Sequence, residues 1–233
     1  MKNFPKHIAV IMDGNGRWAK SQSFERIKGH KRGVEVVKDI TKHCVKIGLK
    51  DLTLYTFSNE NWLRPKAEVI SLMKLFVETL SKELKLLLDN NIKFRVIGDK
   101  GKLDFITRKK INEVEKMTSS NTGMGMNLAI SYGGRQEIIS AVNTILLKDY
   151  SEIDEKKFEK YLFTNEIKHP DLLIRTGKEK RISNFLLWQI AYSEIYFSDS
   201  LWPDFNANEL DEIIIDFQKR ERRYGKTSQQ ISI

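Results

Sequence analysis

The sequence predicts an α/β fold: a single domain over residues 1–233, with a central six-stranded, mostly parallel sheet flanked by helices. Three observations predict it. Short apolar runs alternate with longer segments whose apolar residues recur every three or four positions. Strands that alternate with helices are joined by crossovers, which make neighbouring strands parallel. Hydrophobic residues make up 40% of the chain, enough for a sizeable core, and no Pro- or Gly-rich linker divides it.

The first three elements are a strand, a helix and a strand. A short apolar run at residues 8–12 predicts the first strand. Residues 29–47 carry apolar side chains at helical spacing, and Gly48 follows them as a typical helix end. Residues 52–57 are rich in β-branched and aromatic side chains, which predicts the second strand.

The middle of the chain repeats this alternation. Leucines along one side of residues 68–89 predict a long helix, and residues 92–97 form the third strand behind two asparagines. Residues 107–117 have helical spacing. Residues 124–131 predict the fourth strand, after which a Gly-Gly pair turns the chain into a helix at residues 136–147.

The last third carries four shorter elements. We expect a short helix at residues 156–162 and a terminal helix at residues 208–223. Residues 172–174, behind a proline, predict the fifth strand. Residues 195–197 are the candidate for the sixth.

Charge and cysteine content narrow the function classes. The net charge of +9 suits either nucleic-acid binding or attraction to anionic small molecules and membrane surfaces. No RNP-type, zinc-finger or helix-turn-helix motif supports nucleic acid as a partner. Cys44 is the only cysteine, and neither a secretion signal nor a run of 18 apolar residues is present, so we expect a cytoplasmic protein. Positive charge is densest near the C-terminus, at Lys219, Arg220, Arg222, Arg223 and Lys226. This cluster is interpreted either as a solvated helix end or as a contact with the membrane.

The loop after the first strand combines groups that suit a diphosphate. It supplies a carboxylate, two glycines, an amide, a guanidinium and an indole: Asp13, Gly14, Asn15, Gly16, Arg17 and Trp18. Glycine lets the backbone approach an anion, and successive N–H groups and an arginine can bind phosphate oxygens. A carboxylate repels bare phosphate, so Asp13 indicates a bridging cation or a reacting group. The alternative is a tight surface turn.

Two more polar loops are expected at the same edge, because ligands of an open parallel sheet bind beyond the carboxyl ends of its strands. The loop after the second strand contains Ser58, Asn59, Glu60, Asn61, Trp62 and Arg64. In the loop after the fifth strand, Arg175 and Arg181, with Ser183, could surround a diphosphate with charge-assisted bonds, and Ile182 lies between the last two. The alternative for the second loop is that its polar residues only form a turn or cap a helix. The alternative for the third loop is an exposed basic loop.

Other features are less specific. Arg26 and His30 lie four residues apart and would share one face of a helix. Three roles are open for His30: it could bind a diphosphate, transfer a proton, or be an ordinary surface or packing residue. Glu194 is either a salt-bridge partner or a metal ligand. Apolar residues form either the wall of a channel or ordinary core: residues 72–88, Met124, Met126 and Leu128.

Taken in order, these motifs resemble one family. They are DGNGRW at 13–18, FSNENWLRP at 57–65, YGGR at 132–135, PDLLIRTG at 170–177, RISNFLLWQ at 181–189 and WPDF at 202–205. The chain resembles the cis-prenyltransferases, most closely the bacterial undecaprenyl diphosphate synthases, over nearly its whole length. The motifs are long, which makes chance agreement implausible.

The resemblance implies a homodimer whose six-stranded sheet borders a hydrophobic tunnel. It implies Mg²⁺-dependent condensation of isopentenyl diphosphate with farnesyl diphosphate, with cis stereochemistry. The product would be a long polyprenyl diphosphate, undecaprenyl diphosphate, the glycan carrier lipid of cell-wall synthesis. Because such a product is insoluble in water, the resemblance also implies peripheral contact with the inner face of the membrane.

The resemblance also implies residue roles. Asp13 would bind the metal and act in catalysis, Asn61 would accept a proton, and Glu194 would be a second metal carboxylate that reaches the partner subunit's site. The allylic diphosphate would be held by Gly14, Asn15, Gly16, Arg17, Arg26 and His30. The second loop and the reacting pair would be positioned by Trp18, Ser58, Asn59, Glu60, Asn61, Trp62, Arg64 and Glu68. Isopentenyl diphosphate would be bound by Arg175, Arg181, Ile182 and Ser183.

The chain departs from the family pattern at Lys178, where a second glycine is usual, and at Lys180 and Asn59. It lacks any Asp-Asp dipeptide, which argues against the trans-type synthases and their paired aspartates. Product length is left open, so a cis-synthase of shorter or longer product is one alternative. A basic protein that binds nucleic acid or membrane is the alternative from another class.

Overall fold

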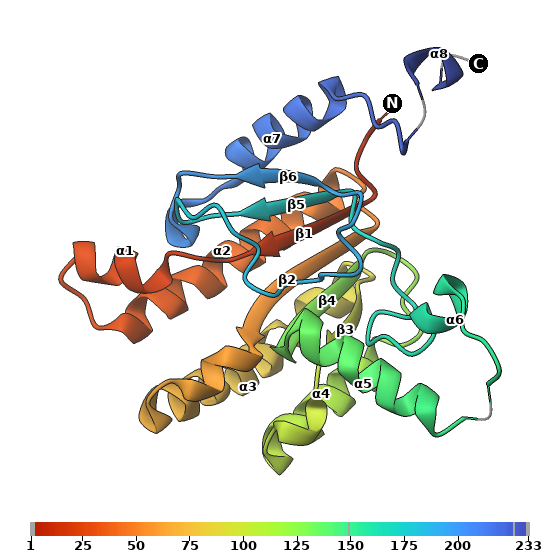
Figure 1. The fold of residues 1–233 in the computed structure, drawn as a ribbon. Helices are drawn as coiled ribbons and strands as arrows, with labels where there is room; N and C mark the ends of the chain where they lie inside the picture. The colour runs from red at the N-terminus through yellow and green to blue at the C-terminus, as the bar shows by residue number, and fades with distance from the viewer. Residues whose placement is uncertain (1–2, 149, 226, 232–233) are drawn as a thin grey trace.

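A six-stranded sheet forms the centre of the protein in the computed structural model, which describes residues 3–148, 150–225 and 227–231 (Figure 1). The strand order is β3-β4-β2-β1-β5-β6, and all five neighbouring pairs are parallel. Each expected strand is confirmed to within one residue at either end: β1 (His7–Ile11), β2 (Asp51–Ser58), β3 (Lys93–Ile97), β4 (Gly125–Tyr132), β5 (Leu172–Arg175) and β6 (Glu194–Phe197).

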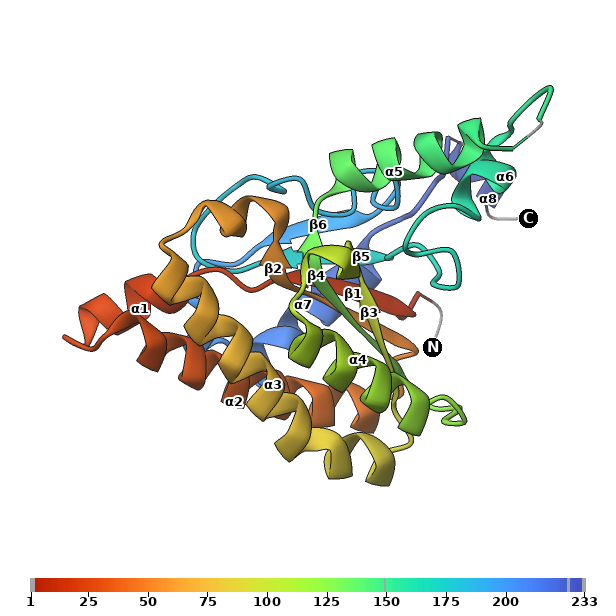
Figure 2. The same cartoon turned by 90° about the horizontal axis from the view of Figure 1, so that it is seen from below.

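Helices cover both faces of the sheet (Figure 2). One face carries α2 (Arg26–Lys46), α3 (Lys66–Asp89), α4 (Phe105–Met117) and α7 (Ala207–Lys219). The other carries α5 (Gly134–Leu146) and the segment around α6 (Glu155–Glu159). The remaining elements are α1 (Asn15–Ser21), α8 (Ser228–Ile231) and the 3₁₀ helices η1 (Asn59–Leu63), η2 (Lys100–Lys102) and η3 (Trp202–Asp204).

The core is divided between the two faces of the sheet. The larger cluster packs β-strand residues such as Ile8 and Leu54 against α2, α3, α4 and α7. The smaller packs Ala9, Ile11 and Leu173 against Phe185 and its neighbours. Because alternate residues of one strand point to opposite faces, the apolar residues 8–11 of β1 serve both clusters. No helix in the described ranges is long and apolar enough to cross a membrane.

The terminal helix is shorter than expected. We predicted it over residues 208–223, but α7 ends at Lys219, and Arg220 is already extended at ψ 138°. Two ion pairs explain the difference: Arg220 binds Glu194 at 2.8 Å, and Arg222 binds Asp171. These tertiary bonds outweigh a weak local preference for helix. Lys226, the last member of the basic cluster, lies outside the described residues.

Candidate active site

The loops after β1 and β5 meet at the carboxyl edge of the sheet, as the sequence predicts. Ile11, the last residue of β1, is in register with Arg175 of β5, and Asp13, two residues further on, lies beside the Arg175 side chain. The Arg175 Nη2 donates to Asp13 Oδ2 at 2.8 Å, and Arg17 Nη2 lies 3.2 Å from Asp13 Oδ1. Both carboxylate oxygens therefore face guanidinium groups.

Asp13 is held in place and kept ionised. Thr176 Oγ1 accepts from the Asp13 N–H at 3.0 Å and lies 2.8 Å from the Asp13 carbonyl oxygen, to which it can donate. Burial alone would raise the pKa of Asp13, but the hydrogen bond from Arg175 and the charge of Arg17 outweigh it and hold that pKa below its ordinary value. A fixed, charged carboxylate results at the end of β1.

Arg175 connects Asp13 to the loop after β5. It is 3% exposed, and its Nη1 donates to Ser183 Oγ at 2.7 Å and to the carbonyl of Arg181. Its Nε is buried and has no protein partner. A buried donor without a partner costs free energy unless a ligand or water satisfies it, so this N–H is available to a ligand oxygen in the site.

The loop after β2 is ordered by its own side chains. Asn61 Oδ1 accepts from the Ser58 N–H at 3.1 Å, and the Ser58 side chain accepts from the Asn61 N–H, which forms a capping box at the start of η1. Asn184 donates to Glu60 at 2.9 Å, so the second and third loops are joined. Ser58 ends β2, next to β1 in the sheet, which brings all three expected loops together.

A cluster of basic side chains lies beyond Asp13. Glu68 Oε1 lies 3.2 Å from Arg26 Nε in an ion pair and accepts a hydrogen bond from Arg64 Nη1 at 3.1 Å. Burial, with the charges of Arg64 and Arg26, lowers the pKa of His30 to about 4, so this imidazole is neutral at pH 7. His30 Nε2 and Asn15 Oδ1 are buried without protein partners. These orphaned polar atoms again suit a polar ligand.

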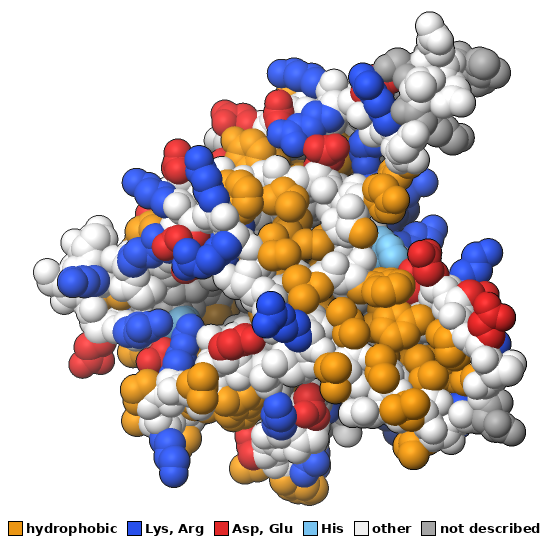
Figure 3. All heavy atoms as spheres, in the orientation of Figure 1, with side chains coloured by type: hydrophobic (Ala, Val, Ile, Leu, Met, Phe, Trp, Pro, Cys, Tyr) orange, Lys and Arg blue, Asp and Glu red, His pale blue; other side chains and the backbone are white. Residues whose placement is uncertain are grey.

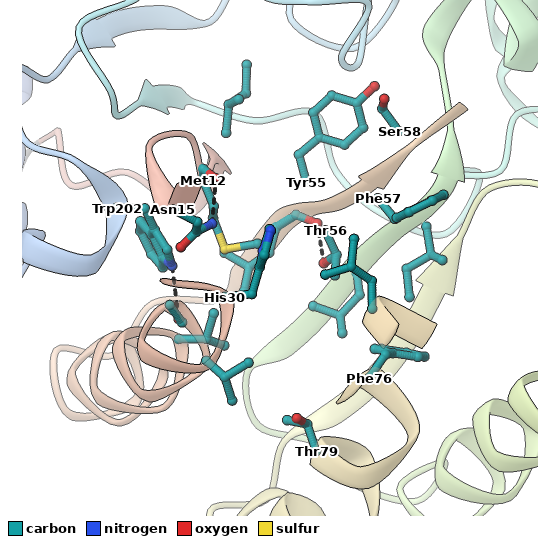
Figure 4. Close-up of a pocket in the computed structure, with 18 of the residues that line it drawn as sticks. Met12, Asn15, His30, Tyr55, Thr56, Phe57, Ser58, Phe76, Thr79 and Trp202 are labelled. Atoms are coloured by element: carbon teal, nitrogen blue, oxygen red, sulfur yellow. Dashed lines mark hydrogen bonds between the residues drawn. The ribbon is translucent and has the colours of Figure 1, made fainter. Parts of the chain in front are cut away.

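These groups surround the mouth of a cavity of about 760 Å³. Behind the mouth, the wall is formed by apolar side chains of α2, α3, β2 and β4, among them Val37, Leu72, Phe76 and Leu128. Figure 4 shows Asn15 and His30 on one side of this space and Phe76 and Thr79 of α3 on the other. In Figure 3, lysine and arginine side chains gather around the hollow between α1 and α3. The hydrophobic tunnel is confirmed, although Met124 does not line it.

Most of the expected site residues line this cavity, and several do not. The lining set is Asp13, Gly14, Asn15, Gly16, Arg26, His30, Ser58, Glu60, Asn61, Arg64, Arg175, Arg181 and Ser183. Trp18 Nε1 donates to Asp204 at 2.8 Å, and Trp62 Nε1 donates to Ser131 at 3.0 Å, which gives both indoles a structural partner. Asn59 accepts from Lys102 at 2.7 Å. Ile182 packs against the smaller core cluster.

Glu194 lies far from Asp13 within one chain. It begins β6, whereas Asp13 follows the end of β1, and parallel strands place these positions at opposite edges of the sheet. Its Oε2 accepts from Arg220 at 2.8 Å. The salt-bridge alternative for Glu194 is therefore confirmed, and its role as a metal ligand stays a prediction.

Sequence reasoning missed three residues that organise the site. Thr176 fixes Asp13, Asn184 joins two loops, and Glu179 pairs with both Arg17 and Arg181. Thr176 lies in the PDLLIRTG motif and Asn184 in the RISNFLLWQ motif, so their place in these motifs was the sequence signal that could have identified them. Lys178, where the family usually has glycine, adopts a left-handed φ of 63°, a conformation that glycine reaches without steric cost.

The donor set fits a magnesium ion shared with a substrate. No group of three or more His, Cys, Asp or Glu side chains that would suit a metal occurs among the described residues. Mg²⁺ is commonly held by one or two carboxylates together with substrate phosphates and water. Asp13, ionised and surrounded by candidate phosphate-binding groups, suits that arrangement and could not hold the ion alone.

A parallel α/β sheet with a cationic, carboxylate-bearing mouth and an apolar tunnel defines a protein that binds amphiphiles with a phosphorylated head and a hydrocarbon tail. The model of one family, described as putative undecaprenyl diphosphate synthase, matches residues 11–225. The chain belongs to this family of prenyltransferases.

Three comparisons agree with that assignment. An isoprenyl transferase of Neisseria meningitidis is 50% identical over 98% of this chain and 92% of its own length. A ditrans,polycis-undecaprenyl-diphosphate synthase of Pasteurella multocida, named as specific for (2E,6E)-farnesyl diphosphate, is 48% identical over 96% of this chain and 95% of its own length. The lavandulyl diphosphate synthase of Lavandula x intermedia, solved with dimethylallyl diphosphate, superposes with a TM-score of 0.93 at 36% identity, covering 97% of this chain and 100% of that one.

Proposed function

We propose that this protein condenses isopentenyl diphosphate units onto farnesyl diphosphate with cis stereochemistry and releases undecaprenyl diphosphate. One observation carries the proposal: the Asp13 mouth and the apolar tunnel belong to a single cavity. A diphosphate at the mouth would then direct its hydrocarbon tail between the sheet, α2 and α3. The family and the Pasteurella relative support farnesyl diphosphate as the allylic substrate.

In the proposed reaction, the allylic C–O bond breaks and its electron pair leaves with the diphosphate. The π electrons of isopentenyl diphosphate form the new C–C bond, and a proton leaves the adjacent carbon. Backbone N–H groups of residues 14–16, with Arg26 and neutral His30, would hold the leaving diphosphate and stabilise its growing charge. Arg175, Arg181 and Ser183 would hold the isopentenyl diphosphate, and Asn61 would accept the proton.

We further propose that Asp13 holds Mg²⁺ together with the allylic diphosphate. When bound, the ion would neutralise charge on the leaving group. Because Glu194 lies at the opposite edge of its own sheet, its proposed role as a second carboxylate requires Glu194 of the partner subunit. The roles proposed for Trp18, Trp62 and Asn59 are indirect, since their side chains bond to protein groups outside the cavity.

Exposed apolar side chains support a homodimer. Five lie on or near α5 and β6: Ile139, Leu146, Leu147, Tyr192 and Ile195, which are between 36% and 85% exposed. Figure 3 shows hydrophobic side chains over much of this face. A contiguous apolar surface of this kind is typical of an interface. We propose a cytoplasmic homodimer that delivers its product, a precursor of the peptidoglycan carrier lipid, at the inner membrane surface.

Product analysis tests this function. The purified full chain is incubated with farnesyl diphosphate, labelled isopentenyl diphosphate and Mg²⁺, and the products are sized by reversed-phase chromatography. We expect a long polyprenyl diphosphate near eleven five-carbon units, lost on adding EDTA and restored by excess Mg²⁺. Products that stop after one addition would show a short-chain synthase instead. Salt-sensitive binding of nucleic acid without any condensation would favour the other class of function.

A further inference from the structure

One ion pair lies in the wall of the largely apolar tunnel. Lys38 of α2 and Glu83 of α3 both line the cavity, and Lys38 Nζ donates to Glu83 Oε1 at 3.2 Å. Their side chains remain 40% and 28% exposed. A charged pair in a hydrocarbon-binding wall loses hydration whenever a chain packs against it, so its presence there calls for a reason beyond packing.

Within the described part of the chain, the Lys38–Glu83 pair is one of two ion pairs that connect α2 to α3. Among the described residues, two ion pairs join these helices: Arg26–Glu68 at the diphosphate end and Lys38–Glu83 deeper in. Arg26 and Lys38 are separated by roughly 18 Å along α2, from the rise per residue of a helix. Figure 2 shows α3 running along α2, and the two ion pairs join them. The deeper pair therefore spans the gap between them beside the tunnel.

Two further polar side chains line the same part of the cavity. Thr41, one turn from Lys38 on α2, has a buried Oγ1 without a protein partner. Thr79, one turn from Glu83 on α3, donates to the Leu75 carbonyl at 2.7 Å. The charged pair and the threonines form a polar band on one side of the tunnel, between apolar residues nearer the mouth and those nearer the far end.

The tunnel is shorter than the proposed product. From Leu72 to Leu87, the lining residues of α3 extend over roughly 22 Å at the helical rise. Eleven five-carbon units contain about 44 backbone bonds, which would extend roughly 50 Å at the rise per bond of an extended peptide. The tail must fold back within the cavity or leave it through a gap in the wall.

We propose that the Lys38–Glu83 pair is a clasp that closes the side of the tunnel between α2 and α3 and thereby limits product length. While the clasp is closed, the tail is confined, and addition stops when the cavity is full. When it opens, the tail passes between the helices and elongation continues. This inference rests on the chain-elongating function proposed above and makes both residues determinants of specificity that take no part in bond formation.

Charge reversal tests the clasp. Lys38→Glu and Glu83→Lys each place like charges across the gap, and the double swap restores attraction. Lys85→Glu is the matched control, because Lys85 lies on α3, pairs with Asp89 and is not a cavity residue. We expect each single reversal to lengthen the most abundant product by at least one five-carbon unit, and the swap and the control to give the wild-type distribution. The rate of the first condensation should stay within twofold of wild type in all four, because the diphosphate site is unchanged.

Two results would overturn the clasp: single reversals with the wild-type product distribution, or longer products that the swap fails to shorten again. The second would show that the native side chains matter rather than their attraction. Thermal melting of each variant confirms that a folded protein is being assayed. If the wild-type chain itself makes no polyprenyl product, the proposed function fails, which is distinguishable from elongation that ignores the clasp.

Discussion

Replacing Asp13 with alanine separates a catalytic from a structural role. The substitution leaves Arg175, whose side chain is 4% exposed, without its anionic partner. Truncating one member of a buried pair costs about 3–5 kcal/mol. Asp13 is 32% exposed, and Arg175 keeps its bond to Ser183, so we expect a smaller loss of about 1–2 kcal/mol. For a chain of this size, that corresponds to a fall in melting temperature of roughly 2–8 °C.

The expected loss of activity is far larger. Removing a single group that stabilises transition-state charge lowers kcat by roughly 10²–10³. Asp13 is also the proposed metal ligand, so we expect a loss of at least about 10³ in the rate of the first condensation, equivalent to about 4 kcal/mol of barrier. The assay is single-turnover condensation of farnesyl and labelled isopentenyl diphosphate, with melting followed by circular dichroism.

Asp13→Asn is the matched control. The amide oxygen can still accept from Arg175, so its melting temperature should lie closer to that of wild type than the alanine variant's does. Its activity should be as low as that of Asp13→Ala, because the charge is gone. Wild-type turnover in either variant, or losses of activity no larger than the stability change explains, would refute the assigned role.

Three further predictions concern pH, tunnel volume and loop geometry. Burial lowers the pKa of His7 to about 4, so as the pH falls from 6.5 the unfolded chain takes up a proton before the folded protein does. The free energy of unfolding should therefore fall by up to about 3 kcal/mol between pH 6.5 and 4. Denaturant titrations of His7→Gln should show a weaker dependence of this free energy on pH. Thr79→Trp, which adds bulk to the tunnel wall, should shorten the main product by at least one five-carbon unit. The control Glu78→Trp, at an exposed position, should leave product length unchanged. Equal product profiles for the two variants would count against the tunnel as the site of the growing chain. Gly177→Ala should lower the free energy of unfolding by about 1–2 kcal/mol and should also lower kcat. The reason is that Gly177 has a φ of +90° and that a Cβ there would lie 2.6 Å from Arg17 Nη2. An unchanged melting temperature and turnover would contradict this.

The strands were predictable because each is a short apolar run bounded by polar or turn residues. The alternation with helices made the sheet parallel, and a parallel sheet brings Asp13, Ser58 and Arg175 to one edge whatever the strand order. The position of β5 beside β1 was not predictable, since it depends on long-range pairing. That pairing places Arg175 against Asp13 at 2.8 Å and makes the two loops one site.

The errors in prediction have local physical causes. α1 has seven residues and η1 has five, which is too short for apolar side chains to recur visibly at helical spacing. The end of α7 is set by the ion pairs of Arg220 and Arg222 with distant carboxylates, which no local pattern encodes. The tunnel depends on how far α2 stands from α3. Leu72 and Phe76 would have the same periodicity in a closed core.

Arg175 has a further consequence for the order of events in the site. Both Asp13 oxygens are paired with guanidinium groups, and Arg175 is shared between Asp13 and Ser183 of the proposed isopentenyl diphosphate loop. A diphosphate that binds this loop competes for Arg175 and weakens its hold on Asp13. In the proposed mechanism, the carboxylate would become available to a cation only as its arginines turn to phosphate oxygens. The two proposed diphosphate subsites would therefore be coupled through one guanidinium. Arg175→Lys, which keeps the charge but loses the planar fork, should weaken the binding of both substrates rather than one.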